Sequence, residues 1–251
     1  MLLREVDDGV IAIAQPSHAW LSGQLARAWG NERFGAVEPH AEVCLAAEQH
    51  DLGMGPWDAA PERNPATGLP FAFTEMPVAL HLRQWREGPE RLLMQSRYAA
   101  LLASRHGSRL QRRRTRAELA AEEADAVRAY LDGQRAFEAR LQSSLAAAPE
   151  LLERNHQLLW TWDFLSLALC LDWAPTTAHD VPTTGEPVEL ELIPAGGDFR
   201  LRLEPWPLRR PAFSVRCEGR RLRGRYESDE ALREALAEAP WEALEFELVP
   251  G

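Results

Sequence analysis

Apolar side chains recur every three or four residues along the first two-thirds of the chain, which is the spacing of amphipathic helices. Ser17 is predicted to cap the first helix, and Gly107 to end the fourth. Residues 56–76 contain four prolines and predict a long irregular loop of the kind that often carries function. The helices predicted from this pattern are residues 18–29, 42–51, 77–85, 89–106, 117–145 and 151–173.

The pattern changes after Pro175, where apolar and polar residues alternate as they do in half-buried strands. Gly196 and Gly197 separate the first two of these segments and predict a hairpin turn. A short helix is predicted at residues 228–239, and a short strand near the N-terminus at residues 10–14. The strands predicted after Pro175 are residues 188–193, 199–203, 213–217 and 244–249.

These elements predict a mainly α fold, α+β overall, with two parts of unequal size. Residues 1–175 are predicted to form a helical domain, and residues 176–251 a small β-rich C-terminal extension. A chain of 251 residues, 45% of them hydrophobic, is long enough for one large domain with such an appendage and can bury a sizeable core.

Charge and cysteine content narrow the classes of partner and the compartment. A net charge of −10 argues against a general nucleic-acid or anionic-membrane binder, and the basic tract at residues 109–116 is predicted to be an exposed connection. The acidic N-terminus does not fit a signal peptide, and the apolar stretch at residues 158–171 is too short to span a bilayer. The three cysteines form no CxxC pair and fit a reducing cytoplasm: Cys44, Cys170 and Cys217. We therefore predict a soluble cytoplasmic protein with a small-molecule substrate as its partner, and leave its oligomeric state open.

Asp163 is the most informative candidate for chemistry. It is the only charged residue between His156 and Asp172, and Trp, Phe and Leu surround it on every helical face. Burying a lone carboxylate costs several kcal/mol unless the group is paired or bound to a metal. Asp163 therefore needs histidine partners or a divalent ion.

Histidines that could serve as those partners stand near the ends of the predicted helices. His18 lies in the first turn of one helix, the pair His50-Asp51 closes the next, and His106 closes a later one. Imidazole and carboxylate groups together suit zinc, manganese, iron, nickel or magnesium to differing degrees. The predicted metal ligands are His18, His50, Asp51, His106 and Asp163.

The order of these residues resembles the HD (His-Asp) domain superfamily. The phrases HAxxSGxLAxxWG, AAxxHDxG, YAALLxSRH and DxLSLxLC are similar to a bacterial HD-like family of unknown function. The resemblance implies a helical domain that binds one or two divalent metal ions and hydrolyses phosphoesters, often of nucleotides. In such an enzyme a metal-activated water attacks phosphorus. The residues predicted to take part in catalysis are Asp51, His106 and Arg105, the last two as groups that neutralise the phosphate or protonate the leaving group.

The same residues also have simpler interpretations. The dipeptide His179–Asp180 shows that a His-Asp pair occurs by chance in this chain. His156 precedes Asp163 by two helical turns and is predicted to be structural, and Trp160 is predicted to be a core aromatic residue. The main alternative function is a non-catalytic metal- or ligand-binding regulatory module. An iron-dependent oxygenase is a further alternative.

Overall fold

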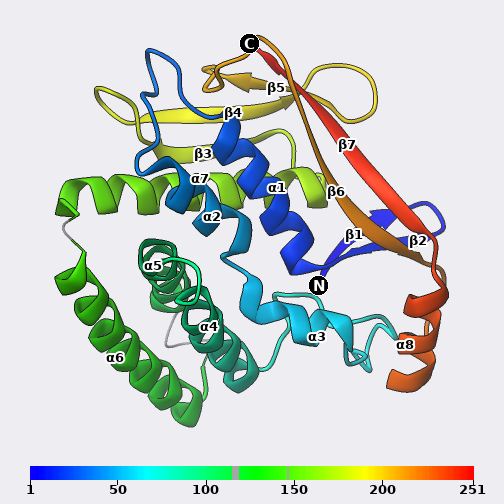
Figure 1. The fold of residues 1–251 in the computed structure, drawn as a ribbon. Helices are drawn as coiled ribbons and strands as arrows, with labels where there is room; N and C mark the ends of the chain where they lie inside the picture. Colours follow the sequence, from blue (N-terminus) through cyan, green and yellow to red (C-terminus); the bar gives the residue numbers. More distant parts are fainter. Residues whose placement is uncertain (115–118, 146) are drawn as a thin grey trace.

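The protein has an α+β fold in which a seven-stranded sheet curls into a half-barrel beside a set of helices (Figure 1). The computed structural model describes residues 1–114, 119–145 and 147–251. Helices make up 49% and strands 21% of it. The prediction of a mainly α fold with a small β-rich extension is therefore wrong, because the sheet is as much a part of the body as the helices are.

The elements follow one another from a β-hairpin, through a helical region, to the remaining strands. The helices are α1 (Gln15–Ala28), α2 (His40–Gln49), the 3-10 helix η1 (Leu52–Met54), α3 (Gly55–Ala59), α4 (Val78–Leu92), α5 (Arg97–Arg113), α6 (Ala121–Ser144), α7 (Pro149–Leu171) and α8 (Asp229–Glu238). The strands are β1 (Leu2–Val6), β2 (Gly9–Ile13), β3 (Thr176–Val181), β4 (Val188–Pro194), β5 (Arg200–Glu204), β6 (Phe213–Leu222) and β7 (Trp241–Pro250).

The sheet takes strands from both ends of the chain, in the order β1-β2-β6-β7-β5-β4-β3. All neighbours are antiparallel except β5 and β7, which are parallel. The N-terminal hairpin joins through β2, where Val10 lies opposite Leu222 of β6. The predicted turn between β4 and β5 is confirmed, and Gly196 and Gly197 adopt φ values of 80° and 79° there.

Two strands were not predicted, and they extend the sheet at its two edges. β1 has the sequence LLREV, which carries two charged residues, and β3 has the sequence TTAHDV with a register shift between Ala178 and Val181. Neither shows the regular alternation of a half-buried strand. Their extended conformation depends on pairing with a neighbour that is already in place, which is information that local sequence does not contain.

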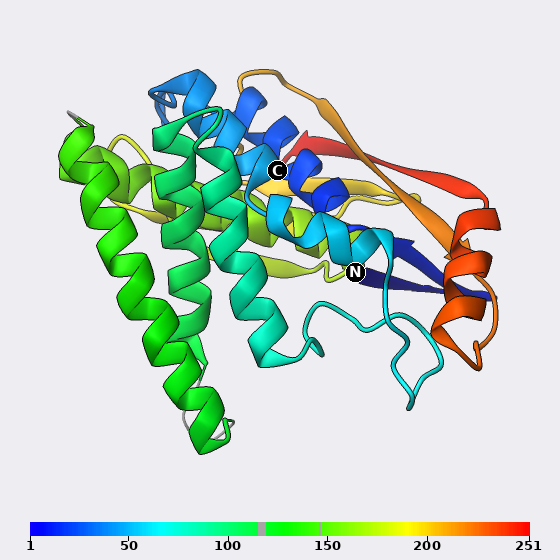
Figure 2. The same ribbon diagram turned by 60° about the horizontal axis from the view of Figure 1, so that its bottom comes forward.

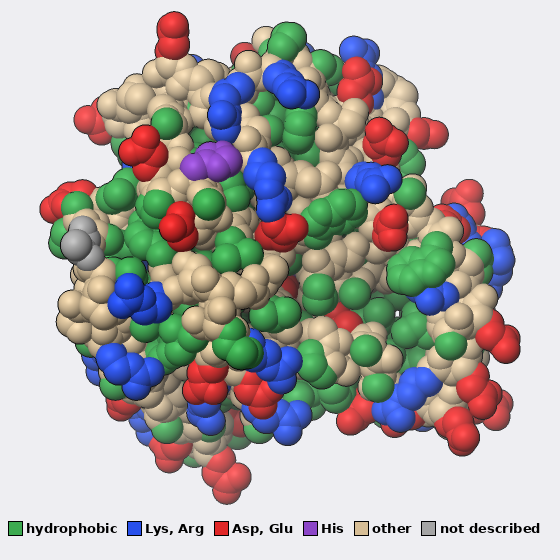
Figure 3. Space-filling model, viewed as in Figure 1, with side chains coloured by type: hydrophobic (Ala, Val, Ile, Leu, Met, Phe, Trp, Pro, Cys, Tyr) green, Lys and Arg blue, Asp and Glu red, His purple; other side chains and the backbone are tan. Residues whose placement is uncertain are grey.

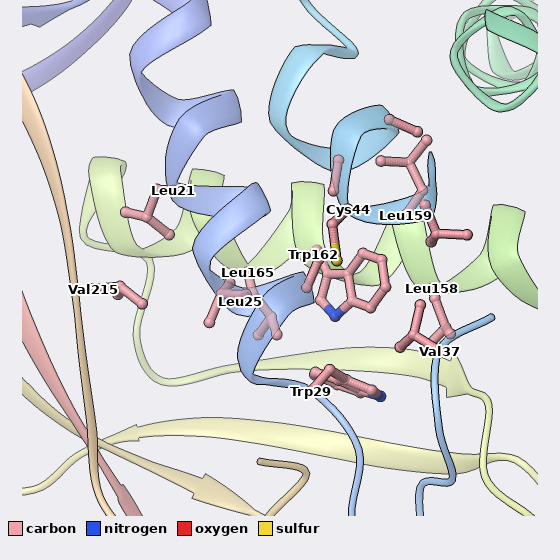
Figure 4. Packing of buried hydrophobic residues seen from close by; sticks show 14 of the residues in the cluster. Leu21, Leu25, Trp29, Val37, Cys44, Leu158, Leu159, Trp162, Leu165 and Val215 are labelled. Atoms are coloured by element: carbon pink, nitrogen blue, oxygen red, sulfur yellow. The ribbon is translucent and has the colours of Figure 1, made fainter. Parts of the chain in front are cut away.

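Helices α1 and α7 pack between the sheet and the outer helices. Figure 4 shows side chains of α1, α2 and α7 converging on one apolar core, in which the rings of Trp29 and Trp162 meet edge to face at 5.7 Å. Val215 of β6 reaches the same core from the sheet. Figure 2 shows α4, α5 and α6 side by side, with α6 farthest from the sheet. Helices α1, α2, α5 and α7 thus enclose the interior of the helical layer.

Several helix ends differ from those predicted. Ser17 does not cap α1, which begins after Ala14, and its hydroxyl instead binds the backbone of Glu218 on β6. Helix α5 continues through Gly107 to Arg113 and so includes part of the basic tract, of which residues 115 and 116 lie outside the described residues. Pro89 lies inside α4 rather than opening a new helix.

The division proposed at residue 175 falls between α7 and β3. Since β2 pairs with β6, the sheet takes strands from both sides of that division, and the assignment of two domains stays a prediction. In the part of the chain that the structure describes, no helix has both the length and the apolarity needed to cross a membrane.

The glycine at position 107, inside α5, has a packing role that can be tested. A Cβ at this position would lie 2.6 Å from the Trp85 ring and 2.9 Å from the Tyr130 hydroxyl, so glycine allows α4 and α6 to pack closely on α5. We expect Gly107→Ala to lower the free energy of unfolding by about 1–3 kcal/mol through overpacking, despite the higher helix propensity of alanine. Urea denaturation measures this difference.

Gly133 on α6 provides the matched control, because a Cβ there meets nothing within 4 Å. We expect Gly133→Ala to raise the free energy of unfolding by about 0.5–1 kcal/mol. Equal stabilisation by both substitutions would contradict the packing argument.

Candidate metal centre

The structure brings five of the six predicted site residues together in the interior of the helical layer. They come from the first turn of α1, the junction between α2 and η1, the middle of α5 and the second half of α7. Their exposed fractions are 2% for His18, 1% for His50, 4% for Asp51, 1% for His106 and 8% for Asp163. Groups from four parts of the chain therefore meet at one buried point.

The junction after α2 explains how adjacent residues both face this point. His50 still has helical backbone angles, whereas Asp51 has φ −97° and ψ 18° and begins a new turn. The change of direction lets both side chains point the same way, which a continuing helix would not allow. Gly53 then lies against the backbone of α4, where a Cβ would overlap the carbonyl oxygen of Gln84.

The carboxylate of Asp163 contacts all three histidines. Its Oδ1 atom lies 3.2 Å from Nε2 of His50 and 3.9 Å from Nδ1 of His18. Its Oδ2 atom lies 3.4 Å from Nε2 of His106. The sequence argument that a buried Asp163 needs histidine partners is therefore met in the fold.

The carboxylate of Asp51 contacts two of these histidines as well. Its Oδ2 atom lies 2.7 Å from Nε2 of His18 and 3.7 Å from Nε2 of His50. One ligand atom from each of His18, His50 and Asp163 lies within 4.8 Å of the others. This buried His-His-Asp cluster could bind a metal ion.

The outer nitrogens of two histidines are fixed by hydrogen bonds. Nδ1 of His50 donates to the Ala47 carbonyl oxygen at 2.9 Å. Ser166 donates its hydroxyl proton to the Asp163 carbonyl oxygen, so its Oγ atom accepts from Nδ1 of His18 at 2.9 Å. Both rings then present Nε2 to the cluster, and such supporting bonds are typical of metal-binding histidines.

The cluster perturbs the protonation of its own members. Burial disfavours the charge on His50, yet Asp51 and then Asp163 outweigh it and raise the pKa of His50 to about 9. Burial also disfavours the charge on Asp163, but His106 and His50 hold its pKa well below the usual range. Burial lowers the pKa of His106, which is therefore neutral near pH 7. Near pH 7 the metal-free cluster thus holds two carboxylates, a charged His50 and a neutral His106.

Two other predicted residues take different positions. Arg105 donates to Gln142 at 3.1 Å and pairs with Glu153 at 3.7 Å, so the structure does not bring its guanidinium to the five clustered groups. The catalytic role predicted for Arg105 stays a prediction. His156 is buried on the face of α7 that carries Asp163, and burial together with the charges of neighbouring groups lowers its pKa to about 3.

The sequence reading did not single out the residues that support the cluster. Ser22 lies one helical turn after His18 and donates a hydrogen bond of 2.9 Å to Ser166, which itself lies three residues after Asp163. Helical spacing of small polar residues around a candidate ligand is the signal that could have found them. The same rule applies to Arg109, three residues after His106, whose guanidinium lies over the ring of Trp160.

Two hollows lie near this part of the fold. The larger, of about 550 Å³, lies between α3, β6 and α8, and Figure 3 shows it on the right of the view. Its lining includes Pro16 and Ser17 but none of the five clustered residues. The smaller, of about 190 Å³, is lined by Trp160 and Arg109, and the Trp160 ring contacts His106 at 5.5 Å between centroids.

The chain belongs to the family described as "Protein of unknown function (DUF3891)", whose model matches residues 1–224. No curated protein and no solved structure matches the chain. The assignment to the HD superfamily is wrong, because the family that matches is a different one and the fold contains a curled seven-stranded sheet rather than helices alone. The shared order of histidines and aspartates was therefore a misleading guide to the fold.

Removing the His50-Asp51 pair should weaken metal binding severely. Loss of one supporting hydrogen bond lowers metal affinity by about 10- to 100-fold. We expect His50→Ala/Asp51→Ala to lower the affinity by more than this, because two ligand groups disappear. Elemental analysis after loading with manganese, zinc, iron or nickel measures this. His179→Ala/Asp180→Ala is the control, because it removes an exposed pair of the same sequence. Equal metal contents in the two variants would contradict the site.

Ser166 should affect metal binding without being a ligand. We expect Ser166→Ala to weaken metal affinity by about 10- to 100-fold, because Nδ1 of His18 loses the acceptor that orients its ring. Titration with a competing chelator measures the change. Ser22→Ala should have a smaller effect, since Ser22 contacts Ser166 rather than the histidine. A larger effect from Ser22 than from Ser166 would refute this order.

Proposed function

We propose that the protein is a metal-dependent hydrolase that cleaves a phosphoester of a small phosphorylated or nucleotide substrate. The observation that carries the proposal is the convergence of three imidazoles and two carboxylates in one buried cluster. A purely structural role would be served better by apolar side chains, because a buried ionic network seldom repays its desolvation. A cluster of this composition is therefore best explained by a ligand that needs it.

The charge of the cluster supports a divalent cation as that ligand. A bound metal ion would displace the proton of His50, and the charge of about −2 on Asp51 and Asp163 would then be balanced by a divalent ion. Burial and, more weakly, the charge of Asp163 disfavour the ionised form of Asp51, but His50 and His18 outweigh them and lower its pKa. A bound cation would take over the part that the charged imidazole plays. Imidazole and carboxylate ligands without thiolate suit manganese, iron, zinc, nickel or magnesium.

The arrangement offers places for one or two ions. His18, His50, Asp51 and one oxygen of Asp163 would hold the first. His106 faces the other carboxylate oxygen of Asp163 and would take part in a second site if two ions bind. A bound divalent ion polarises a phosphoryl oxygen and lowers the pKa of water.

The protein's own residues would orient the reactants and move the proton. Asp51 and Asp163 are the least buried members of the cluster, so water and a phosphoryl group would approach beside them. The neutral His106 faces the cluster through Nε2, which lies 3.4 Å from Asp163. That nitrogen would take the proton that the attacking water loses. It would then return the proton to the oxygen that leaves phosphorus.

A non-catalytic metal-binding module is the second candidate. The observation that favours it is the low exposure of the cluster, since no member exceeds 8%. An ion held this deeply could stabilise the packing of α1, α2, α5 and α7 without meeting a substrate. The two candidates share the metal site and differ in turnover.

We also propose a reducing compartment, the cytoplasm, as the place of action. The support is that the chain has only three cysteines, with no CxxC pair, and that all three are buried.

Turnover separates the enzyme from the module. We expect metal-loaded protein to hydrolyse a phosphoester in a screen of phosphomonoesters and phosphodiesters, and His106→Gln to lower kcat by about 100-fold or more. His106→Gln should keep the metal if His106 serves as a proton carrier, so elemental analysis accompanies the assay.

His40→Gln is the control, because His40 lies at the surface at the start of α2. Metal-loaded wild type that hydrolyses nothing in the screen would refute the enzyme and leave the module. An unchanged kcat in His106→Gln would refute only the proposed role of His106 and would leave the enzyme proposal in place.

A further inference from the structure

Two arginines continue the face of α5 that carries His106. Arg109 and Arg113 follow His106 at three and seven residues, so all three lie on one side of the helix. The guanidinium carbons of these arginines lie over the Trp160 ring, at 4.1 Å and 5.4 Å from its centroid. Two cations therefore share one indole of α7.

These arginines open onto a small pocket between α5, α7 and β3. Its volume is about 190 Å³, and the hydroxyl groups of Thr161 and Thr177 belong to residues of its lining. Sites that enclose a whole small molecule usually measure about 300–1,000 Å³. The pocket therefore fits one part of a ligand rather than all of it.

The charge of the pocket favours an anion. Within the described residues, no carboxylate lies at ion-pair distance from Arg109 or Arg113, and Asp180 is the one acidic residue of the lining. Burial and then the charge of Arg113 lower the pKa of Arg109, although a guanidinium stays protonated. Two cations at close range disfavour each other, although Glu153 and Asp180 act against this at Arg109, and an anion between the guanidinium groups would relieve the repulsion.

The guanidinium of Arg109 is also held in place. Its NH1 group donates to the side-chain oxygen of Gln157 at 2.6 Å, and Gln157 in turn donates to the backbone oxygen of His179 at 3.2 Å. This contact uses one of the five N–H groups of the guanidinium and leaves others for a ligand. A fixed fork is the arrangement that recognises phosphate oxygens in pairs.

The pocket is next to the metal centre. The Trp160 ring contacts His106 at 5.5 Å, and His106 contacts Asp163 at 3.4 Å. One aromatic ring thus separates the arginines from the cluster. A substrate with its reacting group at the cluster would direct its remaining part past Trp160.

We propose that Arg109 and Arg113 form a second anion subsite of the same centre, which holds a phosphate group of the substrate other than the one that is cleaved. The preferred substrates then carry at least two phosphate groups. This inference rests on the proposed phosphoesterase function for its substrate, but anion binding by the pocket can be measured without turnover.

The first experiment titrates metal-free protein with inorganic pyrophosphate by calorimetry, so that the arginine pocket is observed without the metal centre. We expect Arg109→Gln and Arg113→Gln each to weaken binding by about tenfold or more, as loss of a charge-assisted hydrogen bond does. Arg113 is exposed, so its variant tests the pocket even if Arg109→Gln folds poorly. Arg216→Gln is the matched control, because Arg216 also lies over an indole, that of Trp20 at 5.4 Å, outside the pocket. Equal affinity in wild type and both pocket variants would overturn the subsite.

The second experiment uses metal-loaded protein and compares kcat/KM for a bisphosphate with that for the matching monophosphate. We expect wild type to prefer the bisphosphate and Arg109→Gln to reduce this preference about tenfold, whereas Arg216→Gln keeps it. An unchanged preference would overturn the link to the substrate, even if a free anion binds in the pocket. Absence of all turnover together with arginine-dependent pyrophosphate binding would instead refute the proposed function and leave an anion site.

Discussion

The carboxylate of Asp163 is the group on which the arrangement of the helices depends. It projects from the apolar second half of α7 into the core, where a lone charge is not tolerated. His18, His50 and His106 supply its contacts, and each comes from a different helix or helix end. Helices α1, α2, α5 and α7 can therefore pack closely only in the relative positions that bring these side chains together. The apolar core also holds α1 against α7, because Trp29, directly after the last residue of α1, packs against Trp162 of α7.

The curled sheet controls the cluster although it contributes none of the five residues. Ser17 exchanges two hydrogen bonds with the backbone of Glu218 on β6, and the next residue, His18, faces the cluster. At the other end of the core, Arg4 of β1 donates to the carbonyl oxygens of Leu169 and Cys170 in the last turn of α7. A cation near a helix C-terminus is stabilising, because the helix dipole places partial negative charge there. The strands thus fix the positions of the two helices that carry His18 and Asp163.

Enzyme and regulatory module both follow from the same charge argument. Once His50 gives up its proton, two carboxylates and neutral imidazoles remain in a low-dielectric interior, and a divalent ion would balance them. An enzyme, unlike the regulatory module, needs a path by which a substrate reaches the cluster from the surface. Trp160, half-buried between His106 and two arginines, marks such a path and lies between the proposed metal centre and the proposed phosphate pocket. The burial of the centre and the cationic pocket beside it are compatible, because only the reacting group needs to reach the metal.

The sequence by itself determined which side chains need partners, and the tertiary structure decided how these side chains are assembled. An isolated aspartate in an apolar helix must find partners, so Asp163 and the histidines could be identified from composition and spacing alone. Most helices and the strands with regular alternation could be predicted for the same reason, since periodicity is a local property. The edge strands β1 and β3 could not, because their extended form depends on pairing with distant residues. The order of histidines and aspartates also suggested the wrong superfamily, because ligand order constrains the site but not the elements that surround it. Which residues support the ligands was decided by packing alone: Ser166 orients His18 and Arg109 lies on Trp160 only because α7 crosses α1 and α5 at those points.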